Sequence, residues 1–255
     1  MKKLLLPFLI LAITSSAWAI HGGKDARAGE LKSTVALATK NSNGTYKTFC
    51  SGTLIDDQTV LTAAHCHGDS QAEEAFIVFS LDLYVPNPVA LPINGWKVHE
   101  KWDESSVEEK DPRNTHDLAL ATFAGKVPTS HEPAMLLEDD SFVKRNTQIL
   151  VAGYGYKKES MEQGPGGWPE MPSGEGVLRS AKVKVADPAF SQTEVLTTEL
   201  HSGTTSADSG GSAFVRRGPR YYLWGITSRG LTGEDGVYTR VSPFLTWIRE
   251  NLNSN

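Results

Sequence analysis

Short apolar runs separated by turn residues dominate this sequence and limit the folds open to it. From Thr34 onward, runs rich in Val, Ile, Leu, Thr and Phe are broken by Gly, Asn, Asp and Pro. Between Arg179 and Val185, charged and apolar side chains are interleaved, as in a strand with one buried face. These runs lack helical periodicity. About a dozen strands of this kind predict an all-β barrel or sandwich. The expected strands are Val35–Thr39, Ser51–Ile55, Thr59–Thr62, Phe76–Ser80, Trp96–His99, Leu118–Phe123, Ile149–Gly153, Val177–Val185, Val195–Leu200, Ser212–Val215, Tyr222–Ser228 and Gly236–Val241.

The end of the chain departs from this pattern. Pro243 suits the first position of a helix, and Ser242 before it can cap the helix N-terminus. The apolar residues that would share one helix face are Phe244, Trp247, Ile248 and Leu252. We therefore expect one amphipathic helix over residues 242–252.

The first residues have the features of a secretory signal peptide. Lys2 and Lys3 precede the apolar run Leu4–Ile13, and Ala17-Trp18-Ala19 fits a signal peptidase site. The apolar run is shorter than the about 20 residues that a membrane helix needs, and no other stretch approaches that length. The residue directly after the predicted cleavage site is not a cysteine, which argues against a lipoprotein anchor. We expect residues 1–19 to be removed and residues 20–255 to be exported to the periplasm or the medium.

The charge of the mature chain narrows the classes of partner. Removal of Lys2 and Lys3 lowers the 25 basic residues to 23, against 30 acidic residues, for a formal net charge of −7. This charge argues against nucleic acid or an anionic membrane as the main partner. Acidic residues also cluster between Asp103 and Asp111. We interpret that cluster as a solvated loop, with a cation site or a surface for basic substrates as the alternative.

The chain has two cysteines, Cys50 and Cys66. In an exported protein this number predicts one disulfide, worth about 3 kcal/mol in the chain-entropy description. Two free buried thiols are the alternative. The bond would also fasten the residue next to His65. The segment His65-Cys66-His67 contains metal-ligand residue types, but no second cluster accompanies it, so we expect no metal.

A glycine-flanked serine stands near the end of the chain, in the segment Thr205–Ser212. Asp208 precedes Ser209, and Gly210 and Gly211 follow it. The glycines allow positive φ and a close backbone approach, which suits a tight turn whose amides converge as an oxyanion hole. A Ser/Gly-rich hairpin loop is the alternative. A serine is a poor nucleophile until a base takes its proton, so a catalytic role requires a base elsewhere.

Two upstream segments supply the missing groups. Leu61–Cys66 contains His65, and Thr115–Leu120 contains Asp117, so the chain order is His, Asp, Ser. This is the order of chymotrypsin-like peptidases rather than of subtilisins or α/β-hydrolases. At these segments the sequence resembles the trypsin/chymotrypsin family. Further short matches are Ile20–Gly23, Ser51–Ile55 and Gly236–Val241.

The resemblance covers nearly all of the mature chain and implies its architecture. The expected fold is all-β, with two six-stranded antiparallel β-barrels and a C-terminal helix. The first barrel would span about residues 20–130 and the second about residues 131–241, with the active site between them. The loop Lys157–Gly176 would border the cleft.

The same resemblance implies the catalytic roles. Ser209 would be the nucleophile, His65 the general base and then acid, and Asp117 the group that orients the imidazole. Histidine titrates near neutrality, so it can take and return a proton at physiological pH. A buried carboxylate on its far nitrogen fixes the tautomer and stabilises the imidazolium.

The oxyanion donors would be the amides of Ser209 and Ala207. The family normally has glycine at the position of Ala207. If that position needs positive φ, alanine is either strained there by about 1 kcal/mol, or its peptide flips and one donor is lost.

The specificity pocket also follows from the resemblance. Gly203 occupies the floor position where trypsin-like members carry aspartate, and Gly230 and Gly236 match the wall positions. Ser228 matches the position whose backbone pairs with the substrate as an added strand. An uncharged, roomy pocket predicts cleavage after large apolar or aromatic residues.

Two departures from the family pattern lie near this pocket. Thr205 replaces a cysteine that braces the pocket, and Arg229 replaces an aromatic residue at the neighbouring subsite. The alternative interpretation is that Gly203 is a turn glycine and that the selector lies elsewhere, with Glu234 or Asp235 near enough to matter.

The expected signal cleavage would itself create the N-terminus that the family uses as a switch. Family members usually free an Ile amine by trimming a pro-segment, and that amine pairs with the aspartate before the serine. Here the first mature residue would be Ile20, so we expect its amine to pair with Asp208 without a zymogen stage.

Together these observations predict an exported serine endopeptidase that acts through an acyl-enzyme, without metal or cofactor. We expect a monomer whose partners are polypeptide substrates and protein inhibitors. Two alternatives are a protease-fold binding protein that has lost turnover and a hydrolase of esters or small amides with the same triad.

Overall fold

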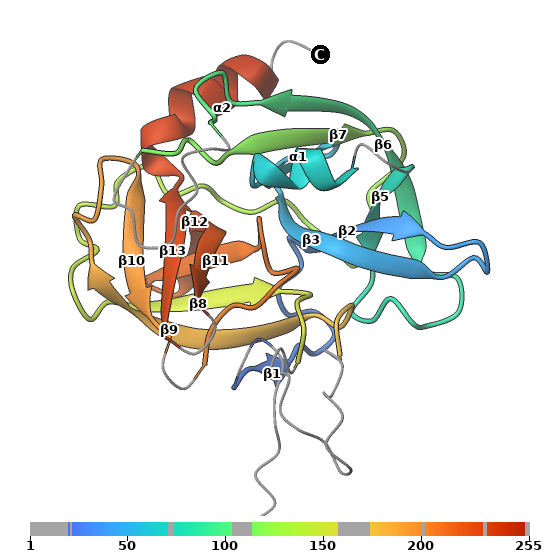
Figure 1. Ribbon diagram of the computed structural model, residues 1–255, viewed down its shortest axis with the longest axis horizontal. Coiled ribbons are helices and arrows are strands. Elements are labelled where there is room, and N and C mark those ends of the chain that lie inside the picture. The colour runs from blue at the N-terminus through green and yellow to red at the C-terminus, as the bar shows by residue number, and fades with distance from the viewer. Residues whose placement is uncertain are drawn as a thin grey trace, which may run out of the picture.

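The structure is a computed structural model that describes residues 20, 22–70, 74–103, 114–157, 174–199, 202–231 and 234–252. Its strands form two closed six-stranded antiparallel β-barrels, followed by a short C-terminal helix (Figure 1). The predicted fold class is therefore confirmed. The predicted signal peptide, His21, and most of the loop Lys157–Gly176 and of the acidic cluster lie outside the described residues.

Each barrel is closed by pairing of its first and last strands in the spatial order. The first barrel runs β2 (Thr34–Lys40), β3 (Tyr46–Leu54), β4 (Thr59–Thr62), β7 (Ala119–Phe123), β6 (Val89–Val98) and β5 (Ala75–Phe79), with β5 returning to β2. The second runs β8 (Gln148–Gly153), β9 (Arg179–Asp187), β10 (Glu194–Thr198), β13 (Asp235–Arg240), β12 (Arg220–Leu231) and β11 (Ser212–Arg217), with β11 returning to β8.

The alternating pattern in β9 is explained by burial on one face of the strand. Ala181, Val183 and Val185 face the core, while Lys182 and Lys184 are exposed. Arg179 lies on the buried side with them, where its Nε donates a 2.7 Å hydrogen bond to the carboxylate of Asp25. A charged residue can take this position because its partner satisfies the guanidinium.

The N-terminal residues do not belong to the first barrel, in contrast to the expected division at about residue 130. The short strand β1 (Lys24–Asp25) pairs with β9, with Lys24 opposite Ser180 (Figure 1). Ile20 is fully buried and packs in the core of the second barrel with Val151 and Tyr238. The start of the described chain is thus attached to the barrel that follows it in sequence.

Three buried clusters hold the molecule together. One fills the first barrel around Leu37, Val60 and Ile77, and another fills the second barrel around Val183, Val215 and Trp224. The third cluster joins the barrels and the C-terminal helix, and its members include Leu61, Leu120, Tyr154, Phe214, Ile226 and Ile248. Among the described residues, no helix is long and apolar enough to cross a membrane.

The helices differ in two details from the sequence prediction. A short helix that was not expected, α1 (His65–Ser70), follows β4 directly. The C-terminal helix starts as a 3-10 turn, Ser242–Phe244, before α2 (Leu245–Leu252). Ser242 does not cap this helix: its hydroxyl donates a 2.8 Å hydrogen bond to Asp140 instead. The residue before it, Val241, already has helical φ and ψ, so the extended backbone that a side-chain cap needs is absent.

Candidate active site

Adjacent strands of the first barrel bring His65 and Asp117 together. His65 begins α1 just after β4, and Asp117 lies just before β7, which pairs with β4. The imidazole Nδ1 lies 2.9 Å from Asp117 Oδ2, and the backbone N–H of His65 donates a 3.1 Å hydrogen bond to Oδ1. The Asp117 side chain is fully buried, whereas that of His65 is 24% exposed. An ionised Asp117 requires Nδ1 to carry the proton, which leaves Nε2 as the basic nitrogen.

The second barrel supplies another donor to this carboxylate. The hydroxyl of Ser228 donates a 2.7 Å hydrogen bond to Asp117 Oδ2. Burial alone would raise the pKa of Asp117, but His65 and these hydrogen bonds hold the pKa below its usual value. Ser228 stands where the β12–β13 register shifts, between Thr227 and Arg229. Such a bulge re-aims a side chain, and no pattern in the sequence signalled this role for the hydroxyl.

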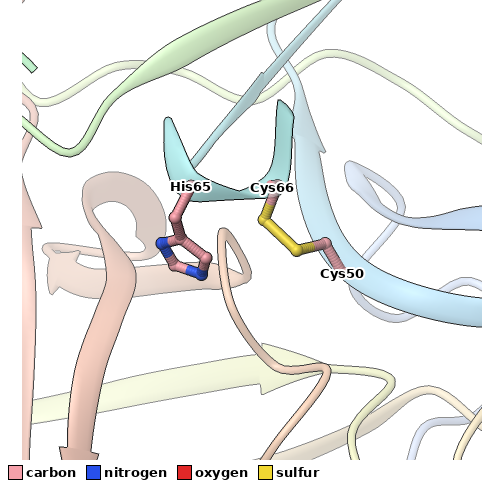
Figure 2. A group of neighbouring side chains, drawn as sticks. All are labelled: Cys50, His65 and Cys66. Carbon is pink, nitrogen blue, oxygen red and sulfur yellow. A yellow bond between two sulfur atoms is a disulfide. The ribbon is translucent and has the colours of Figure 1, made fainter. Parts of the chain in front are cut away.

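The predicted disulfide is present and lies directly beside the histidine. Cys50 on β3 is bonded to Cys66 in the first turn of α1, with a Cα–Cα distance of 6.1 Å. Figure 2 shows the bond reaching from α1 to β3, with the His65 ring beside it. These two sulfur atoms and His65 lie close enough to hold a metal ion. Because the sulfurs are joined to each other, they offer no thiolate ligands.

The segment around Ser209 is a loop packed against the first barrel. The N–H of Ser51 donates a 2.8 Å hydrogen bond to the Ser209 carbonyl, which also lies 3.7 Å from Cys66 Sγ. Gly210 has φ of 74°, and a Cβ there would lie 2.0 Å from Thr62 Oγ1 and 2.5 Å from the Ser51 carbonyl. Glycine is thus required for both backbone conformation and space. The loop joins β10 to β11, which are not neighbours in the sheet, so it is not a hairpin loop.

Ala207 adopts the left-handed conformation that the family glycine would allow, with φ of 69°. The carbonyl before it, that of Ser206, accepts a 3.2 Å hydrogen bond from the Tyr156 N–H. In a planar trans peptide the N–H points opposite to the C=O, so the Ala207 N–H is directed away from Tyr156. The positive φ at Ala207 is the conformation expected to be strained for alanine.

Asp208 is fully buried, and its described hydrogen-bond donors are neutral. Gly155 N–H donates to Oδ1 at 2.8 Å, and Thr205 donates to Oδ2 from its N–H at 2.9 Å and from its hydroxyl at 3.1 Å. Burial raises the pKa of Asp208 to about 7. Thr205, which stands in place of a cysteine, ties this segment together by hydrogen bonds. The described residues show no contact between Ile20 and Asp208, so their ion pair stays a prediction.

A buried acidic side chain that the sequence analysis did not include lies at the predicted pocket floor. The carboxylate of Glu199 fills the space in front of Gly203 and Gly236. A Cβ at Gly203 would lie 2.1 Å from Glu199 Oε2, and a Cβ at Gly236 would lie 2.2 Å from Oε1. The missing side chains therefore make room for Glu199. Gly230, the other wall position, lies close to the backbone of β13, because its Cβ would be 2.4 Å from the Asp235 carbonyl.

The acids named as alternative selectors, Glu234 and Asp235, lie next to Glu199 and Gly230 along the chain trace. Glu234 is exposed, and its carbonyl accepts a 2.9 Å hydrogen bond from the Glu199 N–H. Asp235 is half-buried. Sequence reasoning missed Glu199 because no motif marks it. The available signal was an acidic residue at the end of a predicted strand, close in sequence to the floor glycine.

Arg229 is turned toward a buried acid of β10. Its guanidinium forms an ion pair with Glu194, 2.7 Å from NH1 to Oε1, and the two side chains are 6% and 0% exposed. Glu194 also accepts a 2.5 Å hydrogen bond from the hydroxyl of Thr115, two residues before Asp117. Through Thr115 in the first barrel and Arg229 in the second, Glu194 links the two barrels next to Asp117 and Ser228.

The chain is similar to known proteins over most of its length. The family model described as Trypsin matches residues 20–248. The chain is 26% identical over 266 residues to "CLIP domain-containing serine protease B10" of Anopheles gambiae, an alignment that covers 91% of this chain and 69% of that protein. It is 23% identical over 276 residues to "CLIP domain-containing serine protease B4" of the same organism, covering 91% of this chain and 70% of that protein.

Proposed function

The chain belongs to the trypsin family, and we propose that it is an exported serine endopeptidase that cleaves peptide bonds through an acyl-enzyme on Ser209. The observation that carries this proposal is the 2.9 Å contact between His65 Nδ1 and the fully buried Asp117 carboxylate, beside the loop that bears Ser209. The relatives named above, both described as serine proteases, support the same class of reaction.

Each residue has a defined part in the proposed reaction. The Ser209 hydroxyl attacks the substrate carbonyl as its proton passes to His65 Nε2, and Asp117 stabilises the imidazolium that forms. The imidazolium then gives the proton to the leaving amine, and water repeats the sequence to release the acid product. The N–H groups of Ala207 and Ser209 would stabilise the oxyanion.

In this proposal, β12 binds the backbone of the substrate. Ser228 is skipped in the pairing of β12 with β13. An extended peptide could add to this strand at that residue by backbone hydrogen bonds, while the Ser228 hydroxyl holds Asp117. The same residue would thus position both the substrate and the catalytic carboxylate.

Labelling with a fluorophosphonate tests the proposal directly. We expect the purified mature chain to be labelled and to hydrolyse peptides, and we expect Ser209→Ala to abolish both. Asp117→Asn should lower the labelling rate strongly, because the imidazole would then be held in the wrong tautomer. Absence of labelling would favour a binding protein without turnover. Labelling with hydrolysis of esters but not of peptides would favour a hydrolase of small substrates.

Export is part of the same proposal. Disulfides form and persist in oxidising compartments outside the cytoplasm. The bond between Cys50 and Cys66 therefore supports export and the removal of residues 1–19. N-terminal sequencing of the protein recovered outside the cytoplasm should give Ile20 as the first residue, and light scattering should give the mass of a monomer.

A further inference from the structure

We propose that the buried ion pair of Arg229 and Glu194 positions the catalytic carboxylate of Asp117. This inference rests on the proposed function, because that carboxylate needs a fixed place only if the imidazole beside it acts as a base. In the proposal neither member of the pair touches the substrate or the reacting atoms. The pair acts through its two neighbours, Thr115 along the chain and Ser228 across the boundary between the barrels.

The first route runs through the segment that leads to the catalytic aspartate. Glu194 Oε1 accepts a 2.5 Å hydrogen bond from the Thr115 hydroxyl and lies 2.7 Å from Arg229 Nη1, so one carboxylate oxygen joins the two barrels. A second tie lies next to it. Asn114 Oδ1 accepts hydrogen bonds of 3.2 Å from both the N–H and the hydroxyl of Thr193. Two consecutive residues of the first barrel are thus bound to two consecutive residues of the second.

The backbone between Thr115 and Asp117 needs such ties. His116 has φ of 53°, in the left-handed region that is uncommon for residues other than glycine. A conformation of this kind persists where contacts on both sides over-determine it. Asp117 supplies the contacts on one side, through the hydrogen bonds that its carboxylate accepts. The hydrogen bond from Thr115 to Glu194 supplies the other side, so its loss should let Asp117 move.

The second route runs through the residue before Arg229 on β12. Arg229 Nη1 lies 3.5 Å from Ser228 Oγ, and the Ser228 hydroxyl donates a 2.7 Å hydrogen bond to Asp117 Oδ2. A guanidinium carries donors and no acceptor, so the Ser228 oxygen faces an N–H and its own proton stays directed at the carboxylate. Arg229 therefore supports the direction of the hydrogen bond that Asp117 receives.

The burial of the pair indicates an orienting role rather than contact with a substrate. The side chains of Arg229 and Glu194 are almost completely buried, and they meet at two points, 2.7 Å and 3.1 Å apart. A buried ion pair adds little net stability compared with apolar residues of the same volume. Apolar residues, however, have no donor or acceptor to offer. What the pair provides is therefore a fixed hydrogen-bond geometry at Thr115 and Ser228.

Acylation by p-nitrophenyl acetate tests the proposal, because this small ester carries no side chain for a specificity pocket. The burst gives the acylation rate constant and the ester concentration at half-saturation, both for the mature chain. Rates are expressed per site titrated with a fluorophosphonate, so that misfolded protein does not count, and urea unfolding is measured for every variant. We expect Arg229→Met to lower the rate constant about a hundredfold at unchanged half-saturation, since a shift of about 1 Å in a catalytic group can cost that much.

Two double variants separate positioning from stability. Arg229→Met with Glu194→Met removes both charges, so stability should recover while acylation stays slow, because the Thr115 hydroxyl has lost its acceptor. Arg229→Met with Glu194→Gln returns a neutral carbonyl acceptor at nearly the same volume. Acylation should then be about tenfold faster than in the first double variant, in line with one hydrogen bond. If Arg229→Met does not fold, these two variants carry the test.

Two single variants complete the set. Thr115→Val leaves the ion pair intact and removes only the hydroxyl, so acylation should slow about tenfold with little change in half-saturation. Arg179→Met is the matched control, because Arg179 is also a nearly buried guanidinium that pairs with a carboxylate, that of Asp25. This variant should lower stability and leave the acylation rate per titrated site unchanged.

The outcomes separate this proposal from the proposed function. A raised half-saturation concentration with an unchanged rate constant would make Arg229 a substrate contact and would overturn the proposal. Equal acylation rates in the two double variants, or rates that follow stability in every variant including Arg179→Met, would leave the pair a structural role and would overturn it too. If the unmodified chain is neither labelled nor able to hydrolyse esters or peptides, the proposed function fails, and this inference with it.

Discussion

The hydroxyl of Ser51, on β3 of the first barrel, donates a 2.9 Å hydrogen bond to the carbonyl of Ala207 in the loop that bears Ser209. Its oxygen accepts a 2.9 Å hydrogen bond from the Tyr154 N–H, and the Ser51 N–H donates to the Ser209 carbonyl at 2.8 Å. One residue of the first barrel therefore fixes the carbonyls on both sides of Asp208.

Ser51→Ala should destabilise the protein and lower kcat together. The substitution leaves the buried Tyr154 N–H and the Ala207 carbonyl without their partner, a cost of about 1–3 kcal/mol for each unsatisfied group. Urea unfolding and peptide hydrolysis measure the two effects. Ser130→Ala, on an exposed serine, is the control. Unchanged kcat in Ser51→Ala would show that the loop keeps its conformation without this contact.

Ala207→Gly should relieve backbone strain at the residue with φ of 69°. We expect a gain of up to about 1 kcal/mol in the free energy of unfolding, and undiminished kcat, because glycine adopts positive φ without a Cβ clash. Ala207→Val is the opposite test, since a β-branched residue fits that conformation poorly. If valine leaves stability and kcat intact, the left-handed backbone is not required for the working site.

Removal of the disulfide should lower stability and activity at once. Cys50 and Cys66 are 16 residues apart, so Cys50→Ser with Cys66→Ser should cost about 3 kcal/mol in the free energy of unfolding. Activity should fall as well, because Cys66 is next to His65 in α1. Thermal unfolding and kcat/KM check both effects, and the unmodified protein after reduction should match the variant. Retained activity with lowered stability would mean that α1 holds His65 without the bond.

A free Ile20 amine should be necessary for full activity. The α-amine has a pKa of about 7.7–8.0, and pairing with a buried carboxylate should raise it. A group whose folded pKa is raised stabilises fully below its unfolded pKa, and this contribution is lost as pH rises through the folded value. Activity of the mature chain should therefore fade on the alkaline side. A chain with one extra residue before Ile20 should be crippled, and equal kcat/KM for the two would show that Ile20 is not the switch.

The stability of the extended chain should also depend on pH, over a lower pH range. Without a free amine at residue 20, burial raises the pKa of Asp208 to about 7. Between its unfolded pKa of about 3.9 and that value, the folded state holds a proton that the unfolded state has released, so stability falls as pH rises. Thermal unfolding of the extended chain from pH 4 to pH 8 tests this, with Asp208→Asn as the control. A melting temperature that rises over this range would contradict it.

The strands were predictable because a barrel strand buries one face or both along a short run, and the sequence displays that pattern directly. The twelve expected runs correspond to β2–β13 with shifts at their ends. β1 and α1 were missed because two residues or a short polar segment carry no periodicity of their own. Tertiary contacts produce them.

Site residues could be predicted where a sequence motif contains them. They were missed where only the packing of distant segments brings them to the site. The disulfide between Cys50 and Cys66 followed from composition, and it is confirmed. The position of Glu199 depends on the pairing of β10 with β13. Thr197 lies opposite Gly236, which brings Glu199 close to this glycine. The sequence shows that Gly203 lacks a side chain, but not that the carboxylate of Glu199, which follows β10, occupies the resulting space. The same holds for Ser51 and Ser228, whose hydroxyls act across the boundary between the barrels.

The division of the site between two barrels has a consequence for how its activity could be inhibited. His65 and Asp117 belong to one barrel and Ser209 to the other, and a shared apolar cluster with Leu61, Tyr154 and Ile226 forms the joint between them. Activity should therefore depend on how the two barrels are positioned relative to each other, as well as on the folding of each barrel. We expect that a substitution that tilts one barrel against the other at this cluster would lower activity while leaving the strands of each barrel in place.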